Sequence, residues 1–393
     1  MANFSTIPFT GGVVSTGPRD FSWIPISPTK IALIYTATFN ATVRNVMIQM
    51  VTFSGSATPV YSTPCSLGTI SNLTTLSFMR GAYLRDNLLV MTIPTAFWGS
   101  GVPSTYTYNV VAFDDQDRFN LVSSSSNIAT ASGVTWPSHE MTSYNGRVFS
   151  IRRDTEATYA FAEIVVDAGN AITVTPKTTF SMVTTGVQQG TPVARRAGSF
   201  WYYQANAHGS VQTANSAALI DLATLTTNTV PAGNMIAPNV ASNLARGRTT
   251  TPAGGCILDL AQTSTTYSRF AVDGTIVVNS AAYRAAYTGS VADVLWLDDK
   301  HFLMLNNAGS TITLDRDTAT SMGAMSVQVC RYEQATNAMT VSGAPKALGT
   351  TAPKENFGNL LHKIDESNIA VIGCYQFSTP STHTGYGVQV LSI

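Results

Sequence analysis

The sequence predicts an all-β fold, a seven-bladed β-propeller built of four-stranded blades. Three observations carry this prediction. A strand–turn–strand pattern recurs about seven times at a spacing of roughly 50 to 65 residues, which is typical of a repeat architecture. No segment shows the periodicity of a helix. The two ends of the chain each hold part of one repeat unit.

The clearest copy of the pattern is WLDDKHFLML, residues 296–305. Apolar residues spaced by two on either side of its turn, such as Phe302 and Met304, indicate strands with one buried face. The turn contains Asp298, whose side chain can accept backbone N–H groups. The other copies lie at residues 26–35, 83–93, 143–151, 195–203, 250–260 and 363–373.

Each unit is expected to hold four strands, a to d. The best-defined strands are 21–26, 30–37, 44–53 and 59–66 in the first unit, 76–80, 87–94, 106–113 and 119–123 in the second, and 147–152, 159–166 and 172–179 in the third. Asp273-Gly274 predicts a hairpin in the fifth unit. The expected blades span roughly residues 21–70, 71–130, 131–185, 186–235, 236–285, 286–350 and 351–393 of a single 1–393 domain.

The last unit offers only three strands, 360–363, 368–377 and 385–392. Residues 1–15 precede the first unit, and either 4–9 or 13–15 could supply the missing strand. Closure by the N-terminal strand would leave no long free sheet edge. Two or three β-sandwiches in tandem are the alternative. No linker rich in Pro, Gly or charge separates such domains; residues 133–137 come nearest and fit a d-to-a connection equally well.

The composition argues against several classes of function. Charged residues make up 11% of the 393 residues, with 22 acidic and 22 basic side chains. Nucleic-acid binding therefore has no electrostatic support. The N-terminus does not resemble a secretory signal, and no stretch approaches the ~18 apolar residues of a membrane span. The four cysteines lack metal-binding spacing and fit free, small apolar residues.

The two sets of connections between strands differ in chemistry. The turns of the a–b and c–d connections carry the acidic pairs Asp114-Asp115, Asp298-Asp299 and Asp365-Glu366. Aromatic residues on loops often bind ligands, and sugars stack on them; packing between blades is the alternative reading of each ring. The candidate binding residues of the b–c and d–a loops are Trp98, Trp136, His139, His208, Tyr283, Tyr287 and His383. Trp98 is the first choice because Gly99, Ser100 and Gly101 follow it.

No catalytic motif supports an enzyme. The sequence has no GxSxG, HExxH or P-loop and no pair of carboxylates placed as a propeller glycosidase requires. Residues 114–117 and 315–317 resemble fragments of calcium loops but lack the glycine and the downstream Glu, so solvated turns are expected there. We therefore expect no catalytic residue, no metal site and no cofactor.

The repeat resembles the β-propeller repeats of tail and fibre proteins of tailed bacteriophages. The residues that carry the resemblance are 297–304, 26–34 and 171–174. WD40 and kelch propellers fit less well, because no Trp-Asp dipeptide ends a unit and Gly-Gly doublets do not recur.

The resemblance implies a non-enzymatic structural or binding protein of a virion, associated with a tail, fibre or baseplate. Such a protein assembles in the host cytoplasm, in several copies, with other virion proteins, and can contact a host-surface glycan or receptor. Neither nucleic acid nor membrane insertion is expected. The alternative is an extracellular lectin-like or glycan-processing β-propeller.

Overall fold

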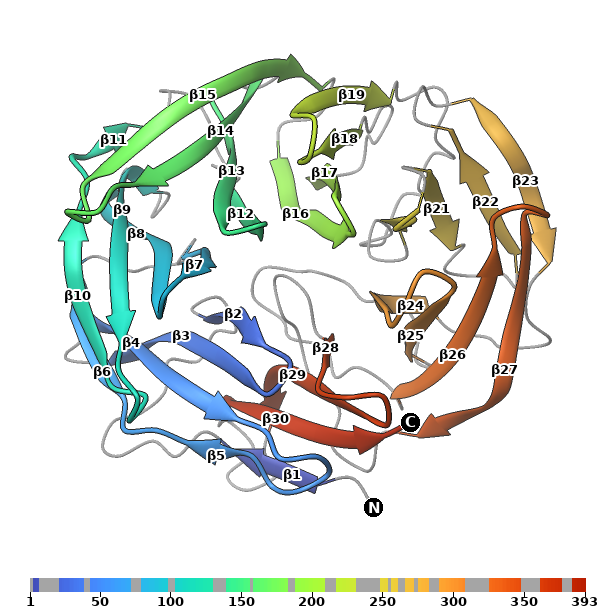
Figure 1. Cartoon of the computed structure of the whole chain (residues 1–393), viewed down its shortest axis with the longest axis horizontal. Coiled ribbons are helices and arrows are strands. Elements are labelled where there is room, and N and C mark those ends of the chain that lie inside the picture. The colour runs from blue at the N-terminus through green and yellow to red at the C-terminus, as the bar shows by residue number, and fades with distance from the viewer. Residues whose placement is uncertain are drawn as a thin grey trace. The chain divides into compact units, whose positions relative to one another are not determined.

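Every described element of the computed structural model is a β-strand, and the strands form seven antiparallel sheets. The described residues are 3–6, 21–38, 43–71, 79–97, 103–129, 139–155, 158–182, 188–208, 217–230, 248–253, 256–260, 266–271, 275–282, 290–307, 325–347, 361–376 and 384–393. The fold is a seven-bladed β-propeller, which confirms the fold class predicted from the sequence. Figure 1 shows the order of strands within each sheet.

The first three blades each come from one continuous stretch of chain. Blade 1 holds β2 (Phe21–Ser27), β3 (Lys30–Thr38), β4 (Val43–Thr52), β5 (Val60–Tyr61) and β6 (Cys65–Ser71). Blade 2 holds β7 (Gly81–Arg85), β8 (Leu88–Phe97), β9 (Pro103–Phe113), β10 (Phe119–Ser124) and β11 (Ile128–Ala129). Blade 3 holds β12 (His139–Tyr144), β13 (Arg147–Arg153), β14 (Thr158–Val166) and β15 (Ile172–Ser181).

The next three blades repeat this order. Blade 4 holds β16 (Gln188–Ala197), β17 (Phe200–His208), β18 (Ala217–Asp221) and β19 (Thr226–Val230). Blade 5 holds β20 (Arg248–Thr250), β21 (Ile257–Leu260), β22 (Thr266–Phe270) and β23 (Ile276–Ala282). Blade 6 holds β24 (Ser290–Trp296), β25 (His301–Asn307), β26 (Met325–Glu333) and β27 (Ala338–Ala347).

Blade 7 takes its strands from both ends of the sequence. Its sheet runs β1-β30-β29-β28, with β1 (Asn3–Thr6), β28 (Leu361–Lys363), β29 (Asn368–Gln376) and β30 (Thr384–Ser392). β1 pairs antiparallel with β30, from Asn3 opposite Val390 to Thr6 opposite Gly387. The predicted closure by an N-terminal strand is therefore confirmed; residues 13–15, the other candidate, lie outside the described residues.

The chain divides into two compact units, one of residues 3–180 and 372–390 and the other of residues 181–371 and 391–393. Within each unit, neighbouring blades share apolar cores. In the first unit, Ile34 of blade 1 belongs to the same core as Leu89 of blade 2, and Val90 of blade 2 to the same core as Val148 of blade 3. Alternate residues of one strand thus serve two different cores.

The b strands are buried on both faces, which corrects the half-buried strand expected around Phe302 and Met304. These two residues do share one face and pack with Leu258 of blade 5. However, Leu303 and Leu305 between and beside them pack with blade 7, and all four side chains are fully buried. The physical reason is that a blade lies between two neighbours, so its middle strands have no solvent face.

The outer strand of blade 1 also differs from expectation. A single strand at 59–66 was predicted, whereas the structure has β5 and β6 with a break between them. Pro64 lies in the break, and proline has no N–H to donate to a strand ladder. Both short strands nevertheless pair with β4.

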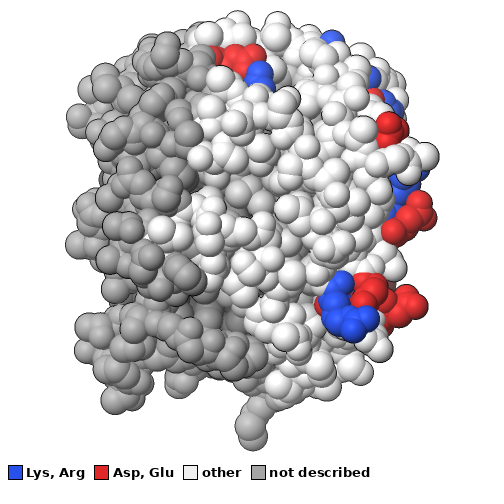
Figure 2. All heavy atoms as spheres, turned by 90° about the vertical axis from the view of Figure 1, so that its left-hand side faces the viewer, with Lys and Arg blue, Asp and Glu red and all other residues white. Residues whose placement is uncertain are grey.

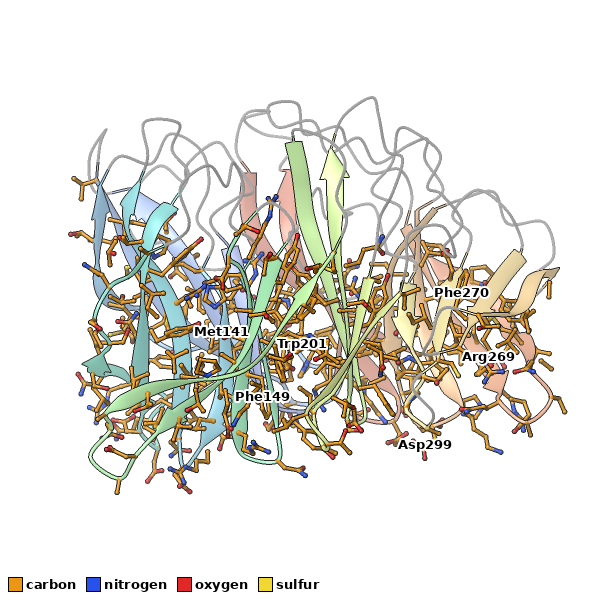
Figure 3. The ribbon with its side chains drawn as sticks, turned by 90° about the horizontal axis from the view of Figure 1, so that it is seen from above. Met141, Phe149, Trp201, Arg269, Phe270 and Asp299 are labelled. Atoms are coloured by element: carbon orange, nitrogen blue, oxygen red, sulfur yellow. The ribbon has the colours of Figure 1, made fainter. Side chains whose placement is uncertain are left out.

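The antiparallel order places the two kinds of connection at opposite edges of every blade. The a–b and c–d turns lie at one edge, which we call the turn edge, and Asp299 is seen there in Figure 3. Met141, Phe149 and Trp201 lie within the packed layer. The strand ends that lead into the b–c and d–a connections lie at the opposite edge, which we call the loop edge. Among the described residues no helix could cross a membrane.

Removing β1 should weaken the fold. We expect deletion of residues 1–6 to lower the unfolding midpoint by ~5 °C or more, because it exposes the ladder edge of β30. Deletion of residues 1–2 alone, which leaves β1 in place, is the matched control and should have little effect. Equal midpoints for the two deletions, measured by circular dichroism, would show that β1 is dispensable.

Candidate functional site

The structure describes the side chain of one of the seven residues predicted to bind a ligand, His139. Trp98, Trp136, Tyr283, Tyr287 and His383 lie outside the described residues. His208 is the last residue of β17, and its side chain is not among those described. The predicted aromatic binding surface as a whole therefore stays a prediction.

His139 is a buried strand residue. It is the first residue of β12, with 2% of its surface exposed. Its ring lies edge-on between Tyr106 and Tyr108, at centroid distances of 5.5 Å and 5.4 Å. This position differs from the exposed loop aromatic that was expected. It agrees with the alternative reading, in which a ring packs between two blades.

His139 belongs to a polar layer between blades 2 and 3. Antiparallel pairing sets His139 opposite Arg152 and Met141 opposite Ser150. Met141 packs against the apolar core that these blades share. His139 lies two residues earlier in β12 and is therefore closer to the loop edge. The interface thus changes from apolar to polar at the strand ends that lead toward residues 130–138 and 156–157.

A short chain of hydrogen bonds orders this layer. The Tyr108 hydroxyl donates to Ser150 Oγ at 3.1 Å and also lies 3.1 Å from His139 Nε2. A phenol has one proton. Because Tyr108 gives that proton to Ser150, its oxygen accepts from His139, and the imidazole proton must be on Nε2. His139 Nδ1 is then a bare acceptor.

Burial keeps the His139 imidazole neutral. Desolvation, assisted by the nearby charges of Arg152 and Arg80, lowers the pKa of His139 to about 3. Desolvation likewise raises the pKa of the Tyr106 hydroxyl well above its ordinary value. Both groups are therefore uncharged at neutral pH, which fits the assignment of Nδ1 as an acceptor and of the Tyr106 hydroxyl as a donor.

The two guanidinium groups of the layer are paired with carboxylates. Arg80 Nε lies 2.9 Å from Glu140 Oε1, and both side chains are largely buried. Arg152 Nε lies 2.7 Å from Asp154 Oδ1, in a pair that is 23% and 32% exposed. The layer is therefore neutral overall, and it reaches solvent through the Arg152–Asp154 pair.

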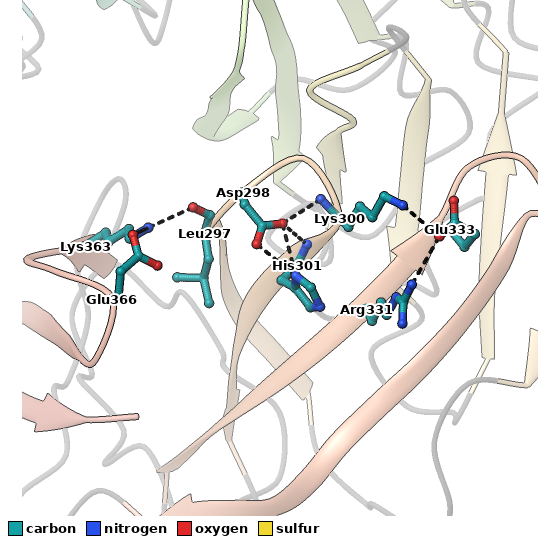
Figure 4. A network of polar contacts seen from close by, with 8 residues as sticks. All are labelled: Leu297, Asp298, Lys300, His301, Arg331, Glu333, Lys363 and Glu366. Atoms are coloured by element: carbon teal, nitrogen blue, oxygen red, sulfur yellow. Dashed lines mark hydrogen bonds and ion pairs between the residues drawn. The ribbon is translucent and has the colours of Figure 1, made fainter.

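The acidic residues of the opposite edge hold the backbone of the turns. Asp298 Oδ1 accepts the backbone N–H groups of Lys300 and His301 at 2.7 Å each, as shown in Figure 4. Side-chain oxygens of the turn residues Asp114, Asp167, Asp221 and Asp365 accept backbone N–H groups in the same way. The acidic character of this edge is therefore structural, and the turn predicted around Asp298 is confirmed.

Charge pairs complete that edge. Lys300 pairs with Glu333 and Lys363 with Glu366 in Figure 4. Desolvation acts to raise the pKa of Asp298, but the hydrogen bonds from Lys300 and His301 outweigh it and lower the pKa to about 2. In Figure 2 most of the charged side chains likewise lie along one edge of the described surface. Because these charged side chains already pair with one another, they contribute little to the binding of a ligand.

A buried ion pair in the second unit was not foreseen from the sequence. Arg195 of β16 lies 2.7 Å from Asp293 of β24, with side chains 5% and 1% exposed. Asp293 also accepts the backbone N–H of Leu361, in β28. One carboxylate thus connects the a strands of blades 4, 6 and 7. The signal available in the sequence was Asp293, a lone charge within the otherwise uncharged strand pattern of residues 290–296.

The described residues show no metal-binding cluster of three or more His, Cys, Asp or Glu side chains. Cys256 and Cys330 are buried cysteines, and Cys65 is partly buried. Asp114 and Asp117, in the first calcium-like fragment, bond to Arg118 and Lys30 respectively. The second fragment, 315–317, lies outside the described residues.

Comparison with known proteins reaches only the level of the fold. No family model and no curated protein matches the sequence. Among solved structures, the polysaccharide lyase Uly1 is 10% identical with a TM-score of 0.55, covering 98% of this chain and 92% of its own. The Cps50 (Swd1) β-propeller domain of Myceliophteria thermophila is 9% identical with a TM-score of 0.45, covering 100% of both chains. The SapL1 lectin, solved with alpha methyl fucoside, is 9% identical with a TM-score of 0.41, covering 84% of this chain and 96% of its own.

The turn role of Asp298 can be tested against its neighbour. We expect Asp298→Ala to lower the free energy of unfolding by about 1 kcal/mol, because two backbone N–H groups lose their acceptor. Asp299→Ala should change it by less than about 0.5 kcal/mol, as is usual for an exposed residue. Chemical denaturation measures both. Equal losses would show that the carboxylate does not hold the turn.

Acid should destabilise the protein through His139. A histidine in the unfolded chain gains a proton below a pKa of ~6.5, whereas folded His139 does so only near 3. Unfolding therefore takes up a proton between these values, and stability falls as the pH falls, by up to about 1.4 kcal/mol per pH unit.

The His139→Gln variant, which is neutral at every pH, isolates this effect. Its stability should fall less than that of the wild type between pH ~6.5 and ~3. Carboxylates with a lowered pKa also make the protein less stable in acid, but by the same amount in both proteins. Glu163 is an example, because chiefly its hydrogen bond with Arg147 lowers its pKa to about 2. Parallel stability–pH curves would contradict the buried neutral imidazole.

Proposed function

We propose that this chain is a non-enzymatic binding protein that recognises its ligand at the loop edge. The observation that carries the proposal is that the polar side chains have different roles at the two edges. At one edge the acidic side chains hold turns and pair with basic neighbours. At the other, strand ends carry a buried layer of Tyr, His and Arg side chains that the fold does not require for turn formation.

The lengths of the connections support the same assignment. Residues 86–87 alone join β7 to β8 at the turn edge, whereas residues 308–324 join β25 to β26 at the loop edge. Long connections on a rigid scaffold commonly carry binding residues. The predicted aromatics Trp98 and Trp136 belong to this set, and Trp136 precedes the polar layer at His139 by three residues.

The setting that we propose is a bacteriophage virion. It rests on the resemblance of the repeats to those of tail and fibre proteins, and on the low, balanced charge of the chain. In that setting the partners are other virion proteins and a host-surface receptor. The protein would assemble in the host cytoplasm and act as part of the particle.

A second candidate is an extracellular glycan-binding or glycan-processing propeller. The observation that favours it is the polar layer itself, because tyrosine, histidine and arginine side chains hydrogen-bond to sugar hydroxyl groups. A polysaccharide lyase shares the overall fold at 10% identity, and a likeness at that level reaches no further than the fold. The described acidic residues of the turn edge do not provide the carboxylate pair of a glycosidase.

Binding and catalysis can be separated with the purified chain. We expect it to bind host cells or particles without releasing sugars from host polysaccharide. Trp98→Ala should weaken that binding by on the order of 2 kcal/mol, as loss of an aromatic anchor does, and leave the unfolding midpoint unchanged. Asp299→Ala is the matched control at the turn edge and should bind as the wild type does.

Two results would contradict the proposal. Sugar release that a single Asp or Glu substitution abolishes would make the protein an enzyme. Unchanged binding by Trp98→Ala, together with a loss of several kcal/mol of stability, would make Trp98 a packing residue between blades and remove the loop edge as the binding surface.

A further inference from the structure

Two buried polar atoms of the layer between blades 2 and 3 lack a hydrogen-bond partner among the described residues. They are the hydroxyl oxygen of Tyr106 and Nδ1 of His139. Their side chains are 1% and 2% exposed, and the two rings lie 5.5 Å apart at an interplanar angle of 79°. A buried polar group without a partner costs about 1–3 kcal/mol. In native proteins such a group is commonly satisfied by a bound water molecule or ion.

The chemistry of the two atoms defines what would satisfy both. The Tyr106 hydroxyl offers a proton. His139 Nδ1 offers a lone pair, because its ring proton lies on Nε2 toward Tyr108. A hydroxyl group accepts and donates at once, so one O–H group can satisfy both atoms. A carboxylate has no proton to give to Nδ1. A buried ammonium group would lack a carboxylate partner, because Glu140 and Asp154 already pair with arginines.

The charges of the layer also favour a neutral group over an anion. Arg80 is committed to Glu140, and Arg152 to Asp154. An anion would therefore meet two guanidinium groups that already have carboxylate partners. The pairs nevertheless polarise the layer, which strengthens hydrogen bonds to a neutral donor and acceptor in a buried setting.

The layer lies at strand ends that lead into the connections of the loop edge. His139 directly follows residues 130–138, which contain Trp136, and Tyr106 lies near the start of β9, which follows residues 98–102 with Trp98. Arg152 lies opposite His139 in the antiparallel pair of β12 and β13, and its side chain is 23% exposed.

We propose that Tyr106 and His139 form a subsite for one hydroxyl group of a saccharide. The inference rests on the proposed binding function and deepens its glycan form. Water and sugar share the O–H chemistry. The proposal assigns the subsite to the sugar, with a water molecule as its occupant when no ligand is bound.

The imidazole of His139 can report on the subsite directly. Nitrogen NMR of the full chain, with His139 assigned by His139→Gln, is followed during titration with methyl glycosides of neutral hexoses and 6-deoxyhexoses. We expect a saturable change at Nδ1 with at least one of these sugars. Tyr106→Phe, which removes only the hydroxyl, should weaken that sugar about tenfold or more, because the sugar hydroxyl loses its donor.

Tyr332→Phe is the matched control. Tyr332 is also buried, and its hydroxyl bonds to Asn337 Oδ1 at 3.3 Å in blade 6. It should bind the sugar as the wild type does. If the Tyr106 variant fails to fold, a second measurement on the wild type replaces it. The wild type is titrated with glycosides that each lack one hydroxyl group, and the glycoside that lacks the bound hydroxyl should no longer change the His139 signal.

Several outcomes would overturn the subsite. If the wild type binds a glycoside and Tyr106→Phe binds it equally well, the binding function stands and the subsite is wrong. If Nδ1 shows a hydrogen bond that no glycoside alters, water alone occupies the subsite. If the wild type binds neither glycosides nor cells nor particles, the proposed function itself fails.

Discussion

The burial of each b strand on both faces is the constraint on which the rest of the structure depends. Phe302 and Met304 of β25 pack toward blade 5, while Leu303 and Leu305 pack toward blade 7. A strand of this kind is stable only with a sheet on either side, so no blade of the chain has a complete core of its own. The turns, the outer strands and the polar layer are arranged around that requirement.

The two edges of the blades meet this requirement in different ways. At the turn edge the backbone reverses within a few residues, and Asp298 and its counterparts satisfy the N–H groups that the strands leave unpaired. At the loop edge the apolar interface between blades 2 and 3 gives way to His139, Tyr108 and Ser150. The turns of the turn edge form their hydrogen bonds within themselves and are rigid. The residues of the loop edge are therefore the part of the scaffold that can be adapted to a ligand.

The blade count, the strand order, the Asp298 turn and the N-terminal closing strand follow from sequence patterns, because each depends on local chemistry or on a missing repeat. The burial of β25 on both faces does not, since a spacing of two is compatible with one or two buried faces. Arg195 pairs with Asp293 across many residues of sequence, and no local pattern indicates such a partner. His139 was singled out by residue type, but its bonds to Tyr108 depend on how two sheets meet.

The pairing of β1 with β30 also sets an order of events during synthesis. Residues 3–6 are synthesised before all the other blades, whereas residues 384–392, their partners, are synthesised after them. All the other blades can form their sheets from continuous chain while translation proceeds. β1 can therefore pair with β30 only after the strands of blades 1 to 6 have been synthesised, so the closure of blade 7 cannot precede the synthesis of the other six blades.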